Sequence, residues 1–219
     1  MPTDSFFLGM DAPRNQSKWD EAQSKVCRGE LVLLRRVHEC IKAYKDIYSP
    51  DRFFRWNHHL ADFLMEKKLG NGFQLVLNLL NQKVLSIFSA AAENGYGIIA
   101  RMPLQFGLLT GKFDNGVSFS DNDHRKNRLT APVIEIANKA LQPVWDLCTR
   151  YNCTKIQLAL SYILSYPEVS TIIPGIRTTE QTKQNTTRLF KLMPEDRLLI
   201  EELGKGSFVE VMQLIQRQG

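Results

Sequence analysis

Apolar residues recur at intervals of three and four through the first third of the chain. One stripe runs through Leu31, Leu34, Val37, Ile41, Tyr44 and Tyr48, with charged residues on the other face. Ser49-Pro50-Asp51 interrupts it, and a second stripe follows at Phe53, Trp56, Leu60, Phe63 and Leu64. This spacing predicts two amphipathic helices, the second closed by Gly70 in a left-handed cap. We therefore predict residues 1–70 to be a mainly helical segment.

From residue 71 onward, short apolar runs alternate with helical patterns. The runs Phe73–Leu77, Gly97–Ile99 and Val169–Ile173 are bounded by glycine, proline or polar residues, which indicates strands. The second and third runs are typical of strands buried on both faces. The helical patterns cover residues 82–93 with Gly95 as the stop, 130–151, 154–166, the residues after Thr178 or Thr179, and two closing segments from Pro194 and Val209. Strands that alternate with helices favour a parallel sheet, so residues 71–219 are predicted to form an α/β unit.

The loop that follows the second predicted strand is a candidate ligand site. It runs from Pro103 to Lys112 and contains Gly107 and Gly111. In parallel α/β proteins, ligands bind at the carboxyl ends of the strands, so this loop is expected to border a binding site. The alternative is a plain surface connection rich in glycine.

A second candidate site follows the third predicted strand. Pro174-Gly175 ends that strand, and Thr178 or Thr179 can cap a helix whose first turn contains Glu180. A helix N-terminus offers free N–H groups and a positive dipole end, and Arg177 adds a permanent positive charge. The combination suits a phosphate group, although it is also an ordinary strand, turn and capped helix.

Several signatures in the same order resemble the aldo-keto reductase family. Pro103 to Lys112 is similar to that family's loop after strand seven, and Ile173-Pro174-Gly175 with Arg177, Gln181 and Asn185 is similar to its NADP-binding segment. The resemblance covers roughly residues 72–203, while the first half of the family's barrel is not recognised. It implies the last three strand–helix units of a (β/α)₈ barrel, that is, a partial TIM-type barrel after an α-helical segment. A whole barrel needs at least about 200 residues.

The resemblance also implies NADP(H) as the cofactor and a set of residues that bind it. Gln74 falls where the family has the glutamine that hydrogen-bonds the nicotinamide carboxamide, and Arg101 replaces an aromatic residue that stacks on the ring. The family's Ser-Asn pair for the same carboxamide is missing. The full predicted set is Gln74, Arg101, Pro103, Leu104, Gly107, Leu108, Lys112, Gly175, Arg177, Gln181 and Asn185.

The catalytic residues that the resemblance implies are not found. The family reduces carbonyls with a tyrosine as general acid, assisted by lysine, aspartate and histidine from the first half of the barrel. No Asp-x-x-x-x-Tyr-Gly-x-x-Glu segment occurs, and Tyr44 and Tyr48 lie on the apolar stripe of a predicted helix, where core packing explains them better. We therefore assign no catalytic residue.

The remaining residue types exclude several other classes. The four cysteines have no metal-binding spacing, and adjacent His58 and His59 point about 100° apart on a helix, so we predict no metal site. His124 is expected to be a solvated loop residue, and the alternative is a place at the entrance of a substrate site.

The net charge of +5 is spread along the chain, which argues against a nucleic-acid-binding protein. No long apolar run and no signal-peptide pattern occur, so we expect a cytoplasmic protein without membrane contact.

Two functions remain open at this point. One is an NADP(H)-dependent oxidoreductase that reduces a small carbonyl compound to an alcohol, truncated and of doubtful activity. The other is a noncatalytic nucleotide-binding or interaction module derived from the same family. Three parallel strands cannot close a barrel, so either version is expected to form homo-oligomers through open sheet edges.

Overall fold

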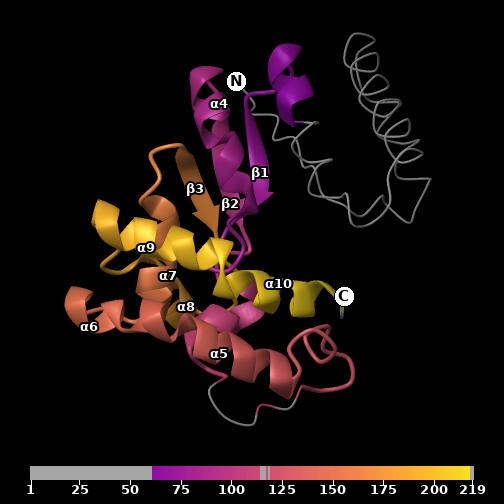
Figure 1. The fold of residues 1–219 in the computed structure, drawn as a ribbon, viewed down its shortest axis with the longest axis vertical. Coiled ribbons are helices and arrows are strands. Elements are labelled where there is room, and N and C mark those ends of the chain that lie inside the picture. The colour runs from indigo at the N-terminus through magenta and orange to yellow at the C-terminus, as the bar shows by residue number, and fades with distance from the viewer. Residues whose placement is uncertain (1–60, 114–116, 118, 218–219) are drawn as a thin grey trace. The chain divides into compact units, whose positions relative to one another are not determined.

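The computed structural model describes residues 61–113, 117 and 119–217 (Figure 1). The chain divides into two compact units, Met1–Gly70 and Asn71–Gly219. In the first unit residues 61–66 are helical, and Lys68, with a φ of 50°, takes the left-handed cap that was predicted for Gly70. The Leu69 amide donates to the Leu64 carbonyl at 2.8 Å across this cap. The rest of the predicted helical hairpin lies outside the described residues.

The second unit contains a parallel sheet of three strands in the order β1-β2-β3. Its strands are β1 (Gly72–Val76), β2 (Gly97–Arg101) and β3 (Val169–Ile173). The prediction of three parallel strands is confirmed, and β3 has the predicted bounds, whereas β1 starts and ends one residue earlier and β2 ends two residues later. Together with its helices the sheet forms a partial α/β barrel, as predicted.

The two faces of the sheet are buried to different extents. Phe73, Ile98 and Ala100 point to one side and are at most 3 % exposed, because α4 packs on β2 and α7 packs on β3 there. The other side, here called the open face, carries Gln74, Val76, Ile99, Arg101, Thr171 and Ile173, none of which is buried. The prediction that β2 and β3 are buried on both faces is wrong, since Ile99 is only half-buried and Ile173 is 43 % exposed.

The helix predicted between the first two strands forms in two pieces. A 3₁₀ turn, η2 (Lys83–Ile87), leads into α4 (Phe88–Glu93). Ala91 in α4 is buried, whereas Ala92 is exposed. Gly95 ends the helix as predicted, with a φ of 74° and the following Tyr96 amide bonded to the Ala91 carbonyl at 2.8 Å.

The long helix predicted after Thr130 is also divided. It forms α5 (Ala131–Trp145) and α6 (Leu147–Tyr151), with Pro143 removing one backbone N–H from the last turns of α5. Asn152, at a φ of 46°, ends α6. Thr154 then opens α7 (Lys155–Leu164) with a capping box, in which its hydroxyl accepts from the Gln157 amide.

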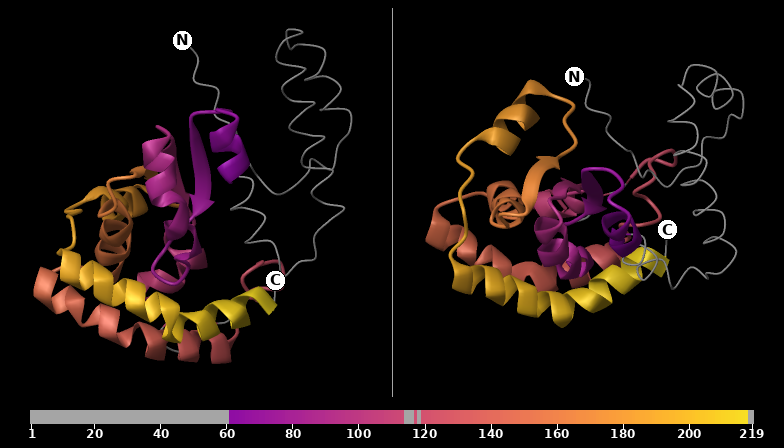
Figure 2. Two further views of the ribbon diagram at one scale, coloured as in Figure 1. Left: turned by 45° about the horizontal axis from the view of Figure 1, so that its top comes forward. Right: turned by 90° about the horizontal axis from the view of Figure 1, so that it is seen from above.

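Three C-terminal helices complete the second unit. They are α8 (Thr179–Thr186), α9 (Pro194–Lys205) and α10 (Ser207–Arg217), and α10 lies alongside α5 (Figure 2). The buried carboxylate of Asp196 ties α9 to α6, because it accepts a hydrogen bond from the Tyr151 hydroxyl at 2.5 Å and pairs with Arg150. Among the described helices, none has the length and apolar character needed to cross a membrane.

Candidate functional site

The loop that follows β2 has an unusual backbone. It includes the short helix η3 (Gln105–Thr110), and Met102, Gln105 and Phe106 have φ values of 55°, 42° and 57°. Side chains other than glycine rarely adopt this left-handed conformation, which costs of order 1–3 kcal/mol per residue when it is strained. Three such residues within five positions make this loop a candidate functional segment.

Asn78, just beyond β1, holds this loop in place. Its side chain is fully buried, and Nδ2 donates to the Met102 carbonyl at 3.0 Å and to Oε1 of Gln105 at 2.8 Å. Oδ1 accepts from the amides of Leu80 and Asn81 at 3.0 and 2.9 Å. One amide therefore fixes the ends of both β1 and β2. Sequence analysis missed Asn78, since its partners lie 24 and 27 positions further along the chain.

The two glycines of the loop are required by its geometry. Gly107 has a φ of 91°, and a Cβ there would lie 3.3 Å from the ring of Phe113. Gly111 has a φ of 75°, and a Cβ there would lie 2.7 Å from Cδ of Lys155 on α7. Any larger residue at either position would be strained and crowded. The absence of a Cβ at these two positions makes room for the Phe113 ring and the Lys155 side chain.

The cofactor residues predicted for this region have different environments. Gln74 and Arg101 both lie on the open face and are half-buried, while Lys112 is exposed beyond η3. Leu108 is only 2 % exposed, so its side chain belongs to the core. The other residues predicted in this loop are the buried Pro103 and the half-buried Leu104 and Gly107.

The second candidate binding segment, which follows β3, begins at the same edge of the sheet as the loop after β2. The β2–β3 register pairs Arg101 with Ile173, so the loops after both strands start next to each other. Gly175 follows β3 with no atom within 4 Å of the position of a Cβ. The structure thus brings the starts of the two predicted segments together at the carboxyl ends of the strands.

The N-terminus of α8 is capped by the side chains of Thr178 and Gln181. The Thr178 hydroxyl accepts from the Gln181 amide at 3.2 Å, and Oε1 of Gln181 accepts from the Arg177 amide at 2.7 Å. Gln181 therefore has a structural role in the cap that the sequence did not indicate. Of its side chain, only the nitrogen Nε2 is left to contact a ligand. Asn185 is buried on α8 at 5 % exposure.

The Arg177 side chain is exposed beside this helix end. No described carboxylate forms an ion pair with it, and Glu180 in the first turn instead accepts from Nε2 of Gln184 at 3.3 Å. The first N–H groups of a helix have no partner within the helix, and its dipole favours an anion there. These donors fit the phosphate of a nucleotide.

A cavity of about 240 Å³ opens at the ends of β1 and β2. It is bounded by those strand ends, the loop after β2 and α10. Its lining is apolar apart from three carboxamides and one guanidinium, and consists of Val76, Asn81, Met102, Gln105, Phe106, Arg128, Met212, Ile215 and Gln216. We call this space the strand-end cavity. Its position is the one at which parallel α/β proteins bind ligands.

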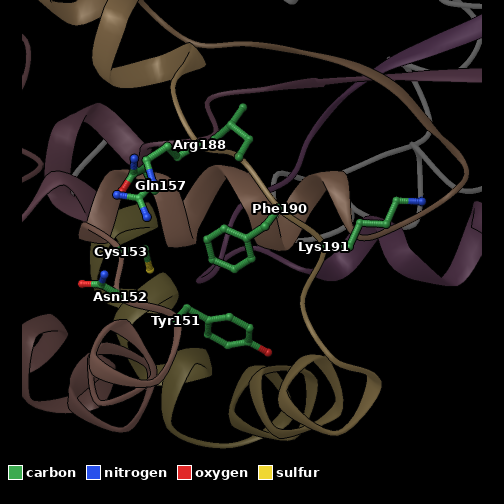
Figure 3. A pocket seen from close by; sticks show the side chains of 8 residues that line it. Tyr151, Asn152, Cys153, Gln157, Arg188, Phe190 and Lys191 are labelled. Carbon is green, nitrogen blue, oxygen red and sulfur yellow. The ribbon is translucent and has the colours of Figure 1, made fainter.

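A larger cavity, about 380 Å³, lies between the α6–α7 junction and residues 188–191. Figure 3 shows the Phe190 ring facing that of Tyr151, with centroids 4.8 Å apart, while Lys191 points away. Two of its polar side chains are already engaged, since the Gln157 amide nitrogen donates to the Thr187 carbonyl at 2.9 Å and the Tyr151 hydroxyl donates to Asp196.

The described tyrosines do not suit the acid that carbonyl reduction requires. Burial raises the pKa of Tyr96, Tyr151, Tyr162 and Tyr166, which are all of the tyrosines in the described part of the chain. A tyrosine that donates a proton near neutral pH needs a lowered pKa instead. The Tyr166 hydroxyl lies 2.8 Å from Glu201 and 2.9 Å from the Tyr162 hydroxyl, which is a buried structural cluster.

Metal-binding side chains do not gather within the described part of the chain. There, no three His, Cys, Asp or Glu residues lie close enough to hold one ion. His58, His59, His38, Cys27 and Cys40 lie outside the described residues. His124 is exposed, as expected for a loop histidine, and its ring meets the edge of Phe106 at a centroid distance of 5.5 Å.

Comparison with known proteins gives one consistent family. The pattern described as "Aldo/keto reductase family" matches residues 72–205. The L-glyceraldehyde 3-phosphate reductase of Escherichia coli K12 is 31% identical over 153 residues, which are 66% of this chain and 43% of that protein. The NADH-specific methylglyoxal reductase of the same organism is 30% identical over 119 residues, 52% of this chain and 35% of its own length.

The fold agrees with that comparison. The structure of a glycerol dehydrogenase from Gluconobacter oxydans superposes with a TM-score of 0.55 at 22% sequence identity. The match covers 71% of this chain and 46% of the dehydrogenase. The chain thus spans less than half of the length of the relatives it matches.

Proposed function

The chain belongs to the aldo/keto reductase family, and we propose that it binds NADP(H) at the edge of the sheet where the segments after β2 and β3 begin. The observation that carries this proposal is the exposed Arg177 guanidinium beside the capped N-terminus of α8. A guanidinium and free helix N–H groups are suited to the 2′-phosphate that distinguishes NADPH from NADH.

The other predicted residues have consistent places in this proposal. The loop from Pro103 to Lys112 would follow the pyrophosphate, with Gly107 allowing close approach and Lys112 offsetting charge. Gln74 and Arg101 on the open face would contact the nicotinamide. When bound, the cofactor supplies a hydride to a carbonyl carbon, and the residues of this chain bind and orient it.

Reduction of a small carbonyl compound to an alcohol is the reaction that the family implies. It also needs a proton donor, and the tyrosines of the described residues have raised pKa values. We therefore propose that carbonyl reduction by this chain is weak or absent, while NADP(H) binding persists. The alternative function is a noncatalytic nucleotide-binding or interaction module, favoured by the same observation on the tyrosines.

The proposal includes the setting in which the protein acts. We place it in the cytoplasm, and we expect copies of the chain to associate through the edges of β1 and β3, which have no strand beyond them among the described residues. Such association would cover part of the open face.

Titration of the purified full chain with NADPH, followed by cofactor fluorescence together with molecular mass, tests the proposal. Saturable binding by a folded species is expected, with a mass above that of the monomer. Addition of a panel of aldehydes then tests for turnover, and slow or undetectable oxidation of NADPH is expected. A folded chain that does not bind NADPH would overturn the proposed function.

A further inference from the structure

The strand-end cavity contains one charged side chain in an otherwise neutral wall. Among its nine lining residues, five are apolar, three are carboxamides, and Arg128 is the single charge. Arg128 lies in the segment that leads into α5, and its guanidinium carbon is 5.2 Å from the centroid of the Phe106 ring. Stacking on an aromatic face holds a guanidinium in place while its N–H groups remain able to donate.

The nearby acidic residues do not neutralise Arg128. Asp123 is held by Arg125 through contacts of 2.5–3.1 Å, which lower the pKa of that carboxyl, and Asp121 pairs with Lys126. Among the described residues no carboxylate pairs with Arg128. His124 meets the same Phe106 ring and adds no negative charge. The cavity therefore has an uncompensated positive charge at its wall.

The rest of the wall sets the kind of molecule that fits. Met102, Phe106, Met212 and Ile215 offer a flexible apolar surface for a short carbon skeleton. The carboxamide of Gln105 is buried and fixed by Asn78, so the wall on that side is rigid. The volume of about 240 Å³ admits a molecule of a few carbon atoms with one head group.

We propose that the strand-end cavity binds the anionic end of a small carbonyl compound, with Arg128 as the residue that selects for a carboxylate or phosphate group. This inference rests on the proposed function for the carbonyl part of the ligand, but the anion site itself can be tested without the cofactor. Arg128 determines specificity by binding and takes no part in proton transfer.

The test uses two stable probes of nearly equal shape, benzoate and benzamide, with the purified full chain. Ligand-observed NMR or calorimetry should show benzoate binding at least about tenfold more tightly than benzamide, because only benzoate forms a charge-assisted hydrogen bond with the Arg128 guanidinium. Arg128→Gln should remove this preference, and Arg128→Lys should retain part of it. Arg188→Gln, which changes an exposed arginine at the other cavity, is the matched control and should behave as wild type.

Phenyl phosphate separates the two head groups, because tighter binding than benzoate would assign a phosphate and weaker binding a carboxylate. Equal affinity for benzoate and benzamide, no benzoate binding by the folded chain, or an unchanged preference in Arg128→Gln would overturn the inference.

Circular dichroism of each variant verifies that it is folded. NADPH titration of the wild-type chain keeps the two proposals apart. If wild type shows no benzoate preference but binds NADPH, only the anion site is contradicted. If it prefers benzoate but does not bind NADPH, only the proposed function is contradicted.

Discussion

The side-chain amide nitrogen of Asn78 lies 2.8 Å from Oε1 of Gln105, and both side chains are buried. This contact joins the end of β1 to a loop whose backbone is strained at Met102, Gln105 and Phe106. A strained segment persists only when its surroundings hold it. Asn78 is the residue that does so here, and the first prediction concerns it.

Asn78→Ala should lower the free energy of unfolding by about 2–4 kcal/mol, because it leaves buried partners such as the Gln105 side chain and the Leu80 amide unsatisfied. Asn94→Ala is the matched control, since Asn94 is exposed and makes one side-chain bond to the Ala90 carbonyl at 2.8 Å. Urea unfolding of both variants measures the difference. Equal losses would contradict the anchoring role.

Arg177→Ala should weaken NADPH binding at least about tenfold and NADH binding much less, because only NADPH has a 2′-phosphate for the guanidinium. Fluorescence titration with each cofactor measures both affinities. Arg188→Ala removes another exposed arginine and should change neither. If Arg177→Ala lost NADPH and NADH affinity equally, the 2′-phosphate assignment would be wrong.

Cys148 should react slowly with iodoacetamide in the folded chain. Burial raises the pKa of its thiol from 9.0 to about 12, and the neighbouring Cys153 thiol contributes. Since only the thiolate reacts, alkylation at pH 8 should be about a thousandfold slower than in concentrated urea, and the difference should shrink as the pH rises towards the raised pKa. Mass spectrometry of the Cys148 peptide gives both rates. Equal rates with and without urea would show that the thiol is not protected.

Tyr166 should make the protein less stable in alkaline solution. Burial raises the pKa of its hydroxyl above 10.0, so the folded state keeps a proton that the unfolded state loses. The free energy of unfolding should therefore fall as the pH rises above about 10, by up to about 1.4 kcal/mol per pH unit for one proton. Tyr166→Phe should reduce this slope.

Urea unfolding of wild type and Tyr166→Phe at a series of pH values measures the two slopes. Well below the ordinary tyrosine pKa, Tyr166 is protonated in both states, so the two slopes should coincide there and serve as the internal control. Parallel curves at every pH would mean that Tyr166 ionises alike in the folded and unfolded chain.

Much of the fold and part of the site could be predicted from local patterns. The three strands, the stop at Gly95, the cap at Thr178 and the capped start of α7 near Thr154 all depend on residues within a few positions of one another. The loop after β2 was predicted as a site because strand ends carry ligands in parallel sheets. The helix breaks at η2 and after α5 were missed, because helical periodicity does not report small changes of pitch.

Other features depend on residues that are distant in the chain, so only the tertiary structure determined them. Asn78 acquires its role from partners 24 and 27 positions away, and Arg128 reaches the strand-end cavity only because its segment packs against Phe106. The exposure of Ile173 follows from its place on the open face, which an apolar run in the sequence does not reveal. The sequence by itself determined the order of the elements and the family, since both are written in local spacing. Folding decided which side chains meet at the ends of the strands, because those contacts arise between segments that only the packed sheet brings together.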